Sequence, residues 1–239
     1  MLILAIDTAT PAASVALLED EVLLNESFFN IRKNHSLTIM PFIDQSLKYC
    51  GVTIRDVSAV AVSIGPGSFT GLRIGLATAK GLCAAAGLPL IAVPTLEMLA
   101  HNITGSSCLV GTLLDARKNE VYLGIYSVEG RVPKALISAG AGTPEQFAAT
   151  AFHIQETHKR SIILIGSGVK PYQNIWSKAW GSKYLIAPPH LLFPRASALA
   201  DLAAIKYAAG EFEDVNSLRP YYIRLSEAEI RLGQGEISC

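Results

Sequence analysis

Two aspartates, Asp7 and Asp115, follow short apolar runs that are predicted to be strands, and each precedes a tight turn. Carboxylates held at such strand ends, one in each half of the chain, can position a metal ion and the phosphates bound to it, as ATP-dependent phosphotransfer requires. Each carboxylate can equally accept hydrogen bonds from the backbone of its own turn. An ATP-dependent small-molecule kinase and a chain without chemistry of its own therefore both remain open.

The stretch SIGPGSFTGLRIG, residues 63–75, places a glycine-rich corner between a predicted strand and a predicted helix. Counted from Gly65, the Walker pattern and the pattern G-x-G-x-x-G both require a glycine where this chain has Thr70, and no lysine follows. Pro66 also removes one backbone N–H from the corner. The stretch is therefore a poor match to phosphate-binding loops.

A small residue recurs at every fourth position along the helix predicted over residues 69–86 and just beyond its ends. The series is Gly67, Gly71, Gly75, Ala79, Cys83 and Gly87. Another element can approach such a helix face closely. Because an interior glycine costs about 1 kcal/mol of helix propensity relative to alanine, we expect a packing reason for the series. The packing element is the chain's own sheet or first helix, a helix of a partner, or both.

The helix predicted over residues 34–50 has Asn34 as its N-cap and Gly51 just beyond its end. Apolar residues occupy more than one side of it, namely Leu37, Ile39, Met40, Phe42, Ile43, Leu47 and Tyr49. A helix with one solvated face does not need a second apolar side. This pattern favours a partner that covers the helix.

His35 stands at the start of the same helix, where it could be half of a metal site. A helical metal site needs a second ligand one turn later, and that position is Ile39. The chain also lacks the serine, cysteine and histidine motifs of hydrolases. We therefore predict no metal site.

The order of predicted elements is repeated along the chain. Three strands, a helix, a strand and a helix are predicted over residues 2–86, and residues 107–132 parallel the opening strands, with Asp115 in the place of Asp7. The segment IGPG, 64–67, likewise has a counterpart in IGSG, 165–168. Strands alternating with helices predict an α/β fold. We expect two lobes, 1–105 and 106–239, with helices over 143–160 and 193–210 and the C-terminal tail in the second.

Half of the 239 residues are hydrophobic, 17% are charged, and the formal net charge is zero. Without a basic run, the chain is not expected to hold tRNA or DNA on its own. The scattered cysteines indicate neither a disulfide framework nor zinc. The longest apolar stretch, 82–93, is interrupted by Gly87 and Pro89 and is shorter than the ~20 residues of a membrane helix, and no export signal is recognised. A cytoplasmic protein without a membrane span is expected.

Five segments, taken in order, resemble the bacterial TsaB family of tRNA threonylcarbamoyladenosine biosynthesis proteins, also called YeaZ. They are ILAIDTAT with SVAL, HSLTIMPFID, GPGSFTGLRIGLATAKGL, DARKNEVYLGIY and LRPYYIRLSEAE. The segment GPGSFTGLRIG together with the later DAR and EVY is highly specific for that family, whereas AIDT is shared by many kinase-like folds. The resemblance spans most of the chain.

The resemblance implies a two-lobed fold of the sugar kinase and actin type, in which each lobe is an RNase H-like sheet flanked by helices. It implies a non-catalytic subunit that binds a related, metal-binding TsaD-like subunit and works with a small TsaE-like ATPase. That complex transfers threonylcarbamoyl to the adenine following the anticodon, in tRNAs that read codons beginning with A. The chain itself would carry no catalytic residue and no cofactor, ATP and Mg²⁺ would act at the level of the complex, and tRNA would be met only there.

The family's partner surface maps to residues 34–50 and 69–86, and without a partner the same surface is expected to form homodimers. The residues expected to bind the partner are His35, Ile39, Phe42, Ile43, Gly71, Leu72, Gly75 and Ala79. A vestigial nucleotide site is expected at Asp7, Asp115, Gly166 and Gly168. Bulky Tyr172 follows that last loop, where active kinases of this fold have more glycine, which argues against strong ATP binding.

Overall fold

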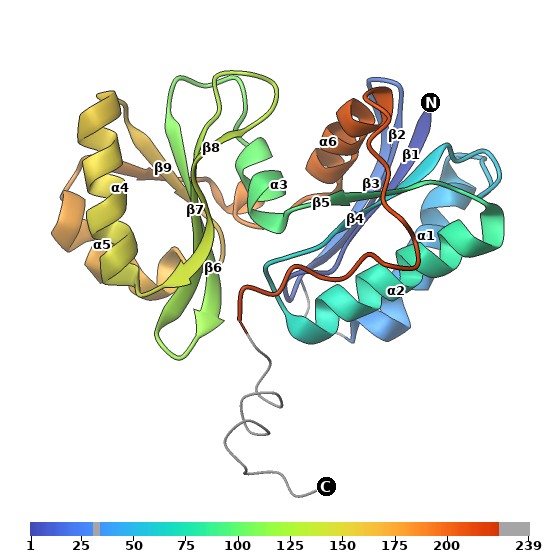
Figure 1. Cartoon of the computed structure of the whole chain (residues 1–239), viewed down its shortest axis with the longest axis horizontal. Helices are drawn as coiled ribbons and strands as arrows, with labels where there is room; N and C mark the ends of the chain where they lie inside the picture. Colours follow the sequence, from blue (N-terminus) through green and yellow to red (C-terminus); the bar gives the residue numbers. More distant parts are fainter. Residues whose placement is uncertain (31–33, 225–239) are drawn as a thin grey trace, which may run out of the picture.

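The computed structural model describes residues 1–30 and 34–224, which form two lobes side by side (Figure 1). Each lobe contains one five-stranded sheet. The first sheet consists of β1 (Leu2–Asp7), β2 (Ala13–Glu19), β3 (Val22–Phe29), β4 (Ala59–Ser63) and β5 (Leu90–Val93). The second consists of β6 (Leu109–Arg117), β7 (Glu120–Ser127), β8 (Lys134–Gly142), β9 (Ile162–Ile165) and β10 (Tyr184–Ile186).

The two sheets share one topology. The strand order is β3-β2-β1-β4-β5 in the first sheet and, read in the same sense, β8-β7-β6-β9-β10 in the second. In each sheet the first three strands pair antiparallel, and the first strand also pairs parallel with the fourth, which pairs parallel with the fifth. The predicted α/β fold and the predicted repeat are therefore confirmed.

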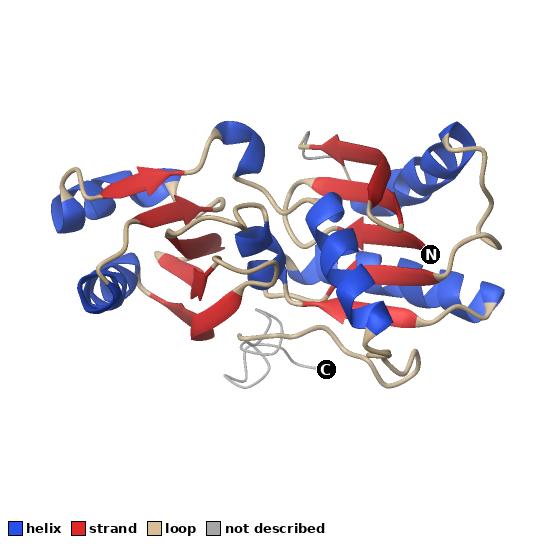
Figure 2. Cartoon of the chain, turned by 90° about the horizontal axis from the view of Figure 1, so that it is seen from above, coloured by secondary structure: helices blue, strands red, loops and turns tan. Residues whose placement is uncertain are grey.

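Helices cover both faces of each sheet (Figure 2). They are α1 (His35–Tyr49), α2 (Phe69–Ala86), α3 (Thr95–His101), α4 (Pro144–His158), α5 (Gln173–Trp180) and α6 (Ala196–Ala208), with short 3-10 turns η1 (Lys170–Tyr172) and η2 (Pro189–Leu191). Helices α1 and α2 share a core with one face of the first sheet, while α6 packs on the other face. No described helix combines the length and the apolar character that a bilayer span needs.

The ends of the predicted helices follow the expected capping chemistry. The Asn34 side chain accepts a hydrogen bond from the backbone N–H of Ser36 at the start of α1. Ser68 caps α2 in the same way, and Gly87 ends it with a φ of 68°, a left-handed conformation that favours glycine. Thr143 and Gln146 form a reciprocal capping box at α4.

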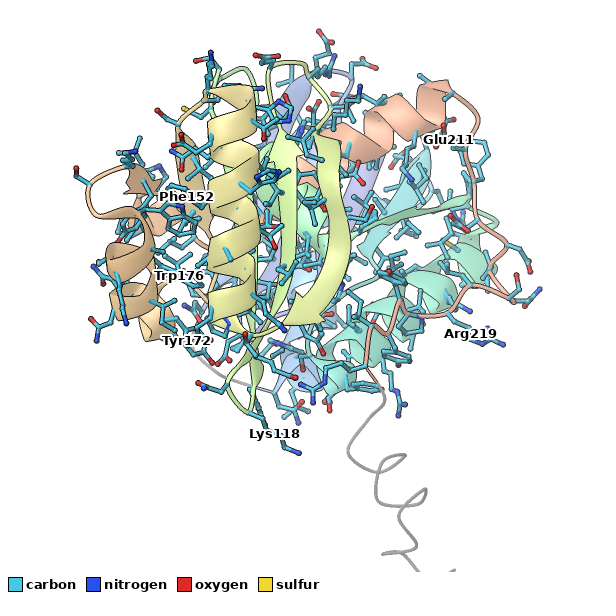
Figure 3. The ribbon with its side chains drawn as sticks, turned by 60° about the vertical axis from the view of Figure 1, so that its left-hand side comes forward. Lys118, Phe152, Tyr172, Trp176, Glu211 and Arg219 are labelled. Atoms are coloured by element: carbon cyan, nitrogen blue, oxygen red, sulfur yellow. The ribbon has the colours of Figure 1, made fainter. Side chains whose placement is uncertain are left out.

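Aromatic residues fill the outer core of the second lobe. Trp176 of α5 is completely buried, and its indole N–H donates to the carbonyl oxygen of Val169 at 2.8 Å. The Phe147 ring of α4 meets the Trp176 ring edge-on, with 5.7 Å between the centroids. Figure 3 shows Trp176 and Tyr172 beside α4, on the side where α5 lies. These large rings hold α4 and α5 together.

Helix α6 belongs to the first lobe, which corrects the expectation that residues 193–210 form a helix of the second. Its apolar residues, Leu199 and Leu202 among them, share a core with Ile3 and Ala5 of β1. No side chain of its own segment caps its first turn. The caps come instead from the strands of the first sheet.

Two strand residues supply the cap of α6. The Ser14 hydroxyl accepts a hydrogen bond from the backbone N–H of Ala196 at 3.0 Å. The Glu26 carboxylate accepts from the N–H of Ser197 at 3.1 Å and forms an ion pair with Arg195 at 2.7 Å. The chain therefore leaves the first lobe after β5 and returns to complete its core at α6.

Candidate functional site

Asp7 lies fully buried at the end of β1. Its Oδ1 accepts hydrogen bonds from the Ser63 hydroxyl at 2.5 Å and from the backbone N–H of Ala9 at 3.1 Å. Burial raises the pKa of Asp7 from 3.8 to about 6, although the hydrogen bonds from Ser63 and Ala9 lower it in part. The Asp7 side chain therefore makes its hydrogen bonds to the turn after β1 and to β4 from inside the protein.

Asp115 stands at the matching place in the second lobe but is exposed. Its Oδ1 accepts a hydrogen bond from the backbone N–H of Arg117 at 2.9 Å, and its own N–H donates to the Ser167 hydroxyl at 3.2 Å. Both aspartates thus cap their own turns, as the simpler sequence interpretation proposed. Within the described residues, no group of three or more His, Cys, Asp or Glu side chains could hold a metal ion.

The two glycine-rich corners close on the chain's own backbone. Gly65 and Gly166 have nearly the same positive φ, 118° and 119°, and so occupy equivalent corners of the repeat. A Cβ added at Gly166 would lie 2.0 Å from the carbonyl oxygen of Leu113. The N–H of Gly168 donates to that same oxygen at 2.9 Å, so this amide is used within the protein rather than for a phosphate. The vestigial nucleotide site remains a prediction.

The small-residue face of α2 is also used inside the chain. A Cβ added at Gly71 would lie 2.0 Å from the carbonyl oxygen of Thr8, and one at Gly75 would lie 2.3 Å from the Thr8 hydroxyl. That hydroxyl donates to the carbonyl oxygen of Gly71 at 2.7 Å. Leu72 and Ala79 are buried as well. Gly71 and Gly75 thus allow α2 to lie close against the turn between β1 and β2. All four residues, which were expected to face a partner, are buried within the chain.

The expected partner-binding residues of α1 also face inward to different degrees. Ile39 and Ile43 are buried in the core shared with the first sheet. Phe42 is half-buried and stacks on Phe29 of β3, with 3.8 Å between the ring centroids. His35 Nε2 lies 2.9 Å from the carbonyl oxygen of Thr10 and so ties α1 to the turn after β1.

The surface that α1 and α2 leave open consists of other residues. On α1, the side chains of Leu37, Met40 and Tyr49 are 74%, 46% and 72% exposed. On α2, the exposed residues include Ala77, Gly81, Ala84 and Ala85. We call these seven residues the outer helix surface. A Cβ added at Gly81 would meet nothing within 4 Å, so this second series of small residues is not required by internal packing.

The sequence carried a signal for this second series. Ala77, Gly81, Ala84 and Ala85 follow the three- and four-residue spacing of one helix face. The more regular glycine series on the opposite face obscured it. The spacing alone does not tell which of the two faces packs on the sheet.

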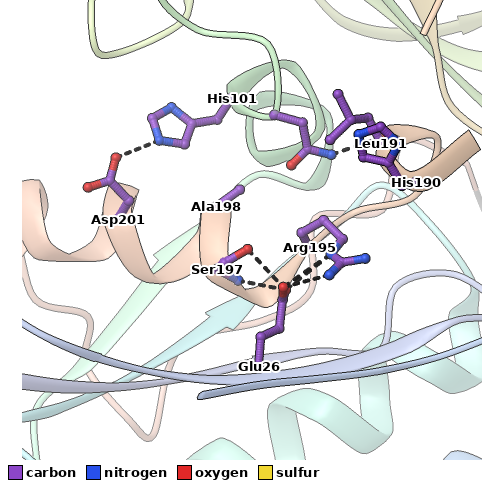
Figure 4. Close-up of a pocket in the computed structure, with 9 residues that line it drawn as sticks. Glu26, His101, His190, Leu191, Arg195, Ser197, Ala198 and Asp201 are labelled. Carbon is purple, nitrogen blue, oxygen red and sulfur yellow. Dashed lines mark hydrogen bonds and ion pairs between the residues drawn. The ribbon is translucent and has the colours of Figure 1, made fainter. Parts of the chain in front are cut away.

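A cavity of about 380 Å³ lies between α3, α6 and the short turn η2 (Figure 4). Its lining residues are Glu26, His101, Asn102, His190, Leu191, Arg195, Ser197, Ala198 and Asp201. The hydrogen bond from His101, at 2.7 Å, and Arg131 hold the pKa of Asp201 at about 2 although burial opposes this. Arg195 is paired with Glu26. The pairs His101–Asp201 and Glu26–Arg195 connect α6 to α3 and to β3. The polar side chains of this cavity therefore serve mainly to hold these elements together.

A family model described as TsaD, tRNA N6-adenosine threonylcarbamoyltransferase, matches residues 24–232. The tRNA threonylcarbamoyladenosine biosynthesis protein TsaB of Bacillus subtilis is 33% identical over 97% of each chain. The protein of the same name from Escherichia coli is 31% identical, over 94% of this chain and 95% of its own.

Solved structures agree with these sequence relatives. YeaZ from Pseudomonas aeruginosa has a TM-score of 0.79 at 29% identity, covering 92% of this chain and 99% of its own. Component A of (R)-2-hydroxyglutaryl-CoA dehydratase from Acidaminococcus fermentans has a TM-score of 0.53 at 10% identity and shares the fold alone. Because named relatives match over almost the full length of both chains, the protein belongs to the TsaB (YeaZ) family of tRNA threonylcarbamoyladenosine biosynthesis proteins.

Proposed function

We propose that this chain is a non-catalytic subunit of the tRNA threonylcarbamoyladenosine synthesis complex. Its family membership supports a role in that biosynthesis. In the proposal, the chain binds and stabilises a TsaD-like catalytic subunit, which works with a TsaE-like ATPase. The complex moves threonylcarbamoyl from threonylcarbamoyl-AMP to the adenine following the anticodon. ATP, Mg²⁺ and tRNA are bound by the complex, in the cytoplasm, and not by this chain alone.

The outer helix surface is the observation that carries the proposal. Leu37 and Tyr49 are each more than two-thirds exposed, which leaves large apolar side chains in water on one helix. Beside them, α2 presents Gly81 and neighbouring alanines, which allow the backbone of another helix to come close. A partner's helix pair would bury both features in one helical bundle. Two copies of this chain could use the same surface when the partner is missing.

The aspartate geometry supports the absence of a catalytic role. The Asp7 carboxylate is fully buried, and its Oδ1 is engaged by Ser63 and Ala9. The exposed Asp115 carboxylate accepts from Arg117 in its own turn. Each aspartate thus has a structural use in its own turn, which supports a chain that performs no phosphotransfer itself.

Sedimentation velocity of the chain mixed with the TsaD-like protein of the same organism tests the proposal. We expect a one-to-one complex with the unaltered chain. Gly81→Arg should abolish the complex, because the long side chain fills the close-approach site while adding helix propensity. Gly75→Arg is unsuitable for this purpose, since its side chain would collide with Thr8 inside the protein.

The matched control is Ala149→Arg, at an exposed position of α4 in the second lobe. It introduces the same side chain on a helix surface and should leave the complex intact. Wild-type affinity in Gly81→Arg would show that the outer helix surface is not the docking site. No complex with the unaltered chain would overturn the proposed function itself.

A further inference from the structure

The segment after α6, residues 211–224, runs back along the first lobe toward the second (Figure 1). Figure 3 labels Glu211 and Arg219, which lie along this segment. We call it the C-terminal strap. Its Glu213 N–H donates to the carbonyl oxygen of Leu90 at 2.8 Å, which forms an isolated bridge to β5. Further along, Lys80 of α2 donates to the carbonyl oxygen of Asn216 at 3.3 Å. The strap is therefore attached to the first lobe along its length.

Aromatic contacts fix the strap to the first turn of α2. The ring of Tyr222 stacks on that of Phe69, with 4.1 Å between the centroids and 6° between the planes. Arg73 donates from Nε to the Tyr222 hydroxyl at 3.0 Å, and its guanidinium lies over both rings. Stacked rings under a cation form a specific attachment rather than a loose surface contact.

The backbone of the strap joins the corner after β4. Tyr221 N–H donates to the carbonyl oxygen of Ile64 at 2.7 Å. A Cβ added at Gly65 would lie 2.6 Å from the carbonyl oxygen of Tyr221. Because Gly65 has no side chain, the backbone of the strap at Tyr221 can lie directly on the backbone of the corner after β4.

Three residues beyond Tyr221, the strap reaches the other lobe. The Arg224 guanidinium forms an ion pair with the Glu120 carboxylate and lies 3.5 Å from the carbonyl oxygen of Ala116. Both partners belong to the hairpin of β6 and β7. Residues 221–224 thus bridge the corner after β4 in one lobe and the Asp115 hairpin in the other.

Arg131 forms a second set of ion pairs between the lobes, away from the strap. Arg131, in the loop between β7 and β8, donates to Glu21 of the first lobe at 3.1 Å and to Asp201 of α6 at 2.7 Å. In Figure 1 this loop lies at the top of the molecule, while the strap crosses at the bottom. The two ties therefore hold opposite ends of the space between the lobes.

We infer that the C-terminal strap is a latch, in which residues 221–224 hold the two lobes at one fixed angle. Lobes joined by short connections move relative to one another unless their interface is large or otherwise secured. Two-lobed proteins of many kinds use such hinge motion around a ligand. Here the pairing of Arg224 with Glu120, together with the Arg131 tie, opposes that motion, so the chain acts as one rigid body. This inference does not depend on the identity of a partner.

Distances between spin labels on the full chain test the latch. Labels at Arg55→Cys and Lys178→Cys occupy exposed positions of the two lobes, with the native cysteines replaced by serine. An excess of unlabelled protein restricts the signal to distances within one molecule. We expect one narrow distance distribution in the parent chain. Arg224→Glu places two carboxylates at the joint and should broaden the distribution or shift it.

Arg219→Glu is the matched control. Arg219 lies in the same strap, and among the described residues it donates only to the carbonyl oxygens of Asn216 and Leu218. It makes the same charge change and should keep the narrow distribution. The exchange Arg224→Glu with Glu120→Arg should restore it. If Arg224→Glu lowers expression of folded protein, Glu120→Gln removes the ion pair more gently. An unchanged distribution in folded Arg224→Glu or Glu120→Gln, or equal broadening in Arg219→Glu, would overturn the latch.

Discussion

In the first lobe, α2 lies close against the turn after β1 through Gly71 and Gly75, whereas the helix in the corresponding place of the second lobe, α5, is packed through large rings such as Trp176. The strand order around both helices is the same. One lobe brings backbones together by omitting side chains, and the other fills the space with aromatic ones. The same topology therefore accepts two kinds of packing.

The difference has a consequence for the helix surfaces. On its inner face, α2 packs closely on the turn after β1 through glycines. On its outer face, nothing lies within 4 Å of a Cβ added at Gly81, so a second helix can approach closely there. In the second lobe, α4 and α5 share their aromatic residues with each other and with the sheet. The first lobe thus presents an outward series of small residues on α2, suited to another helix.

Removing the central ring of the second lobe gives the largest expected effect. Trp176→Ala should lower the free energy of unfolding by about 3 to 5 kcal/mol, because it leaves a large cavity and removes the indole hydrogen bond to Val169. Urea denaturation followed by circular dichroism measures this. Lys178→Ala, exposed on the same helix, is the control and should change little. A loss below about 1 kcal/mol would mean that the rings do not carry the packing of this lobe.

Adding one methyl group to the close contact of the first lobe should cost nearly as much. Gly71→Ala brings a Cβ to 2.0 Å from the backbone oxygen of Thr8, so either α2 or the turn must move. We expect a loss of about 3 kcal/mol, at the upper end of the range for overpacking. Equilibrium unfolding in urea is again the measurement, and unaltered stability would show that α2 can shift outward freely.

The buried aspartate of the first lobe predicts a pH dependence of the free energy of unfolding. Because the pKa of Asp7 is about 6 in the folded protein and 3.8 ordinarily, folding favours the protonated form. Its contribution to stability is complete below about pH 4 and is lost as the pH rises through 6. The loss is at most about 3 kcal/mol, since one pKa unit corresponds to about 1.4 kcal/mol.

Asp7→Asn should remove this decline, as measured by urea unfolding at several pH values from about 4 to 7.5. If Asp7→Asn and the parent chain lose the same stability over this range, the pH dependence arises from other groups.

The smallest expected effect is a gain. Gly81→Ala adds a methyl group where nothing lies within 4 Å, and alanine favours a helix interior by about 1 kcal/mol over glycine. The free energy of unfolding should rise by about that amount. Gly71→Ala on the inner face of α2 should lower the free energy of unfolding, whereas Gly81→Ala on the outer face should raise it. The same substitution therefore distinguishes the two faces. A loss of stability in Gly81→Ala would indicate that the outer face is covered within the chain itself.

Local signals predicted the helix ends and strands of the first lobe well. The predicted bounds of α2, 69–86, agree with the structure, because Ser68 and Gly87 both carry capping chemistry. Strand β8 was not predicted from its own residues, since KALISAGAG is rich in alanine and glycine, which are uncommon in strands. The repeat offered a signal for it, because β8 is the counterpart of β3.

Contacts between distant parts of the chain escaped prediction. The placement of α6 depends on Ser14 and Glu26, which lie far from Ala196 in sequence and cap it from the first sheet. Gly71 faces inward because α2 packs on the carbonyl oxygen of Thr8, and no spacing rule in the sequence identifies that contact. The sequence thus pointed to α1 and α2 as the candidate site, whereas the identity of the exposed residues on that helix pair required the three-dimensional structure.

The return of α6 to the first lobe also sets an order for folding during synthesis. The face of the first sheet that includes Ile3 and Ala5 stays uncovered until α6 has been made, close to the end of the chain. The strands and outer helices of the second lobe lie within residues 109–186 and are complete before then. Although its strands are translated first, the N-terminal lobe can therefore complete this face of its core only after the strands of the second lobe have been made.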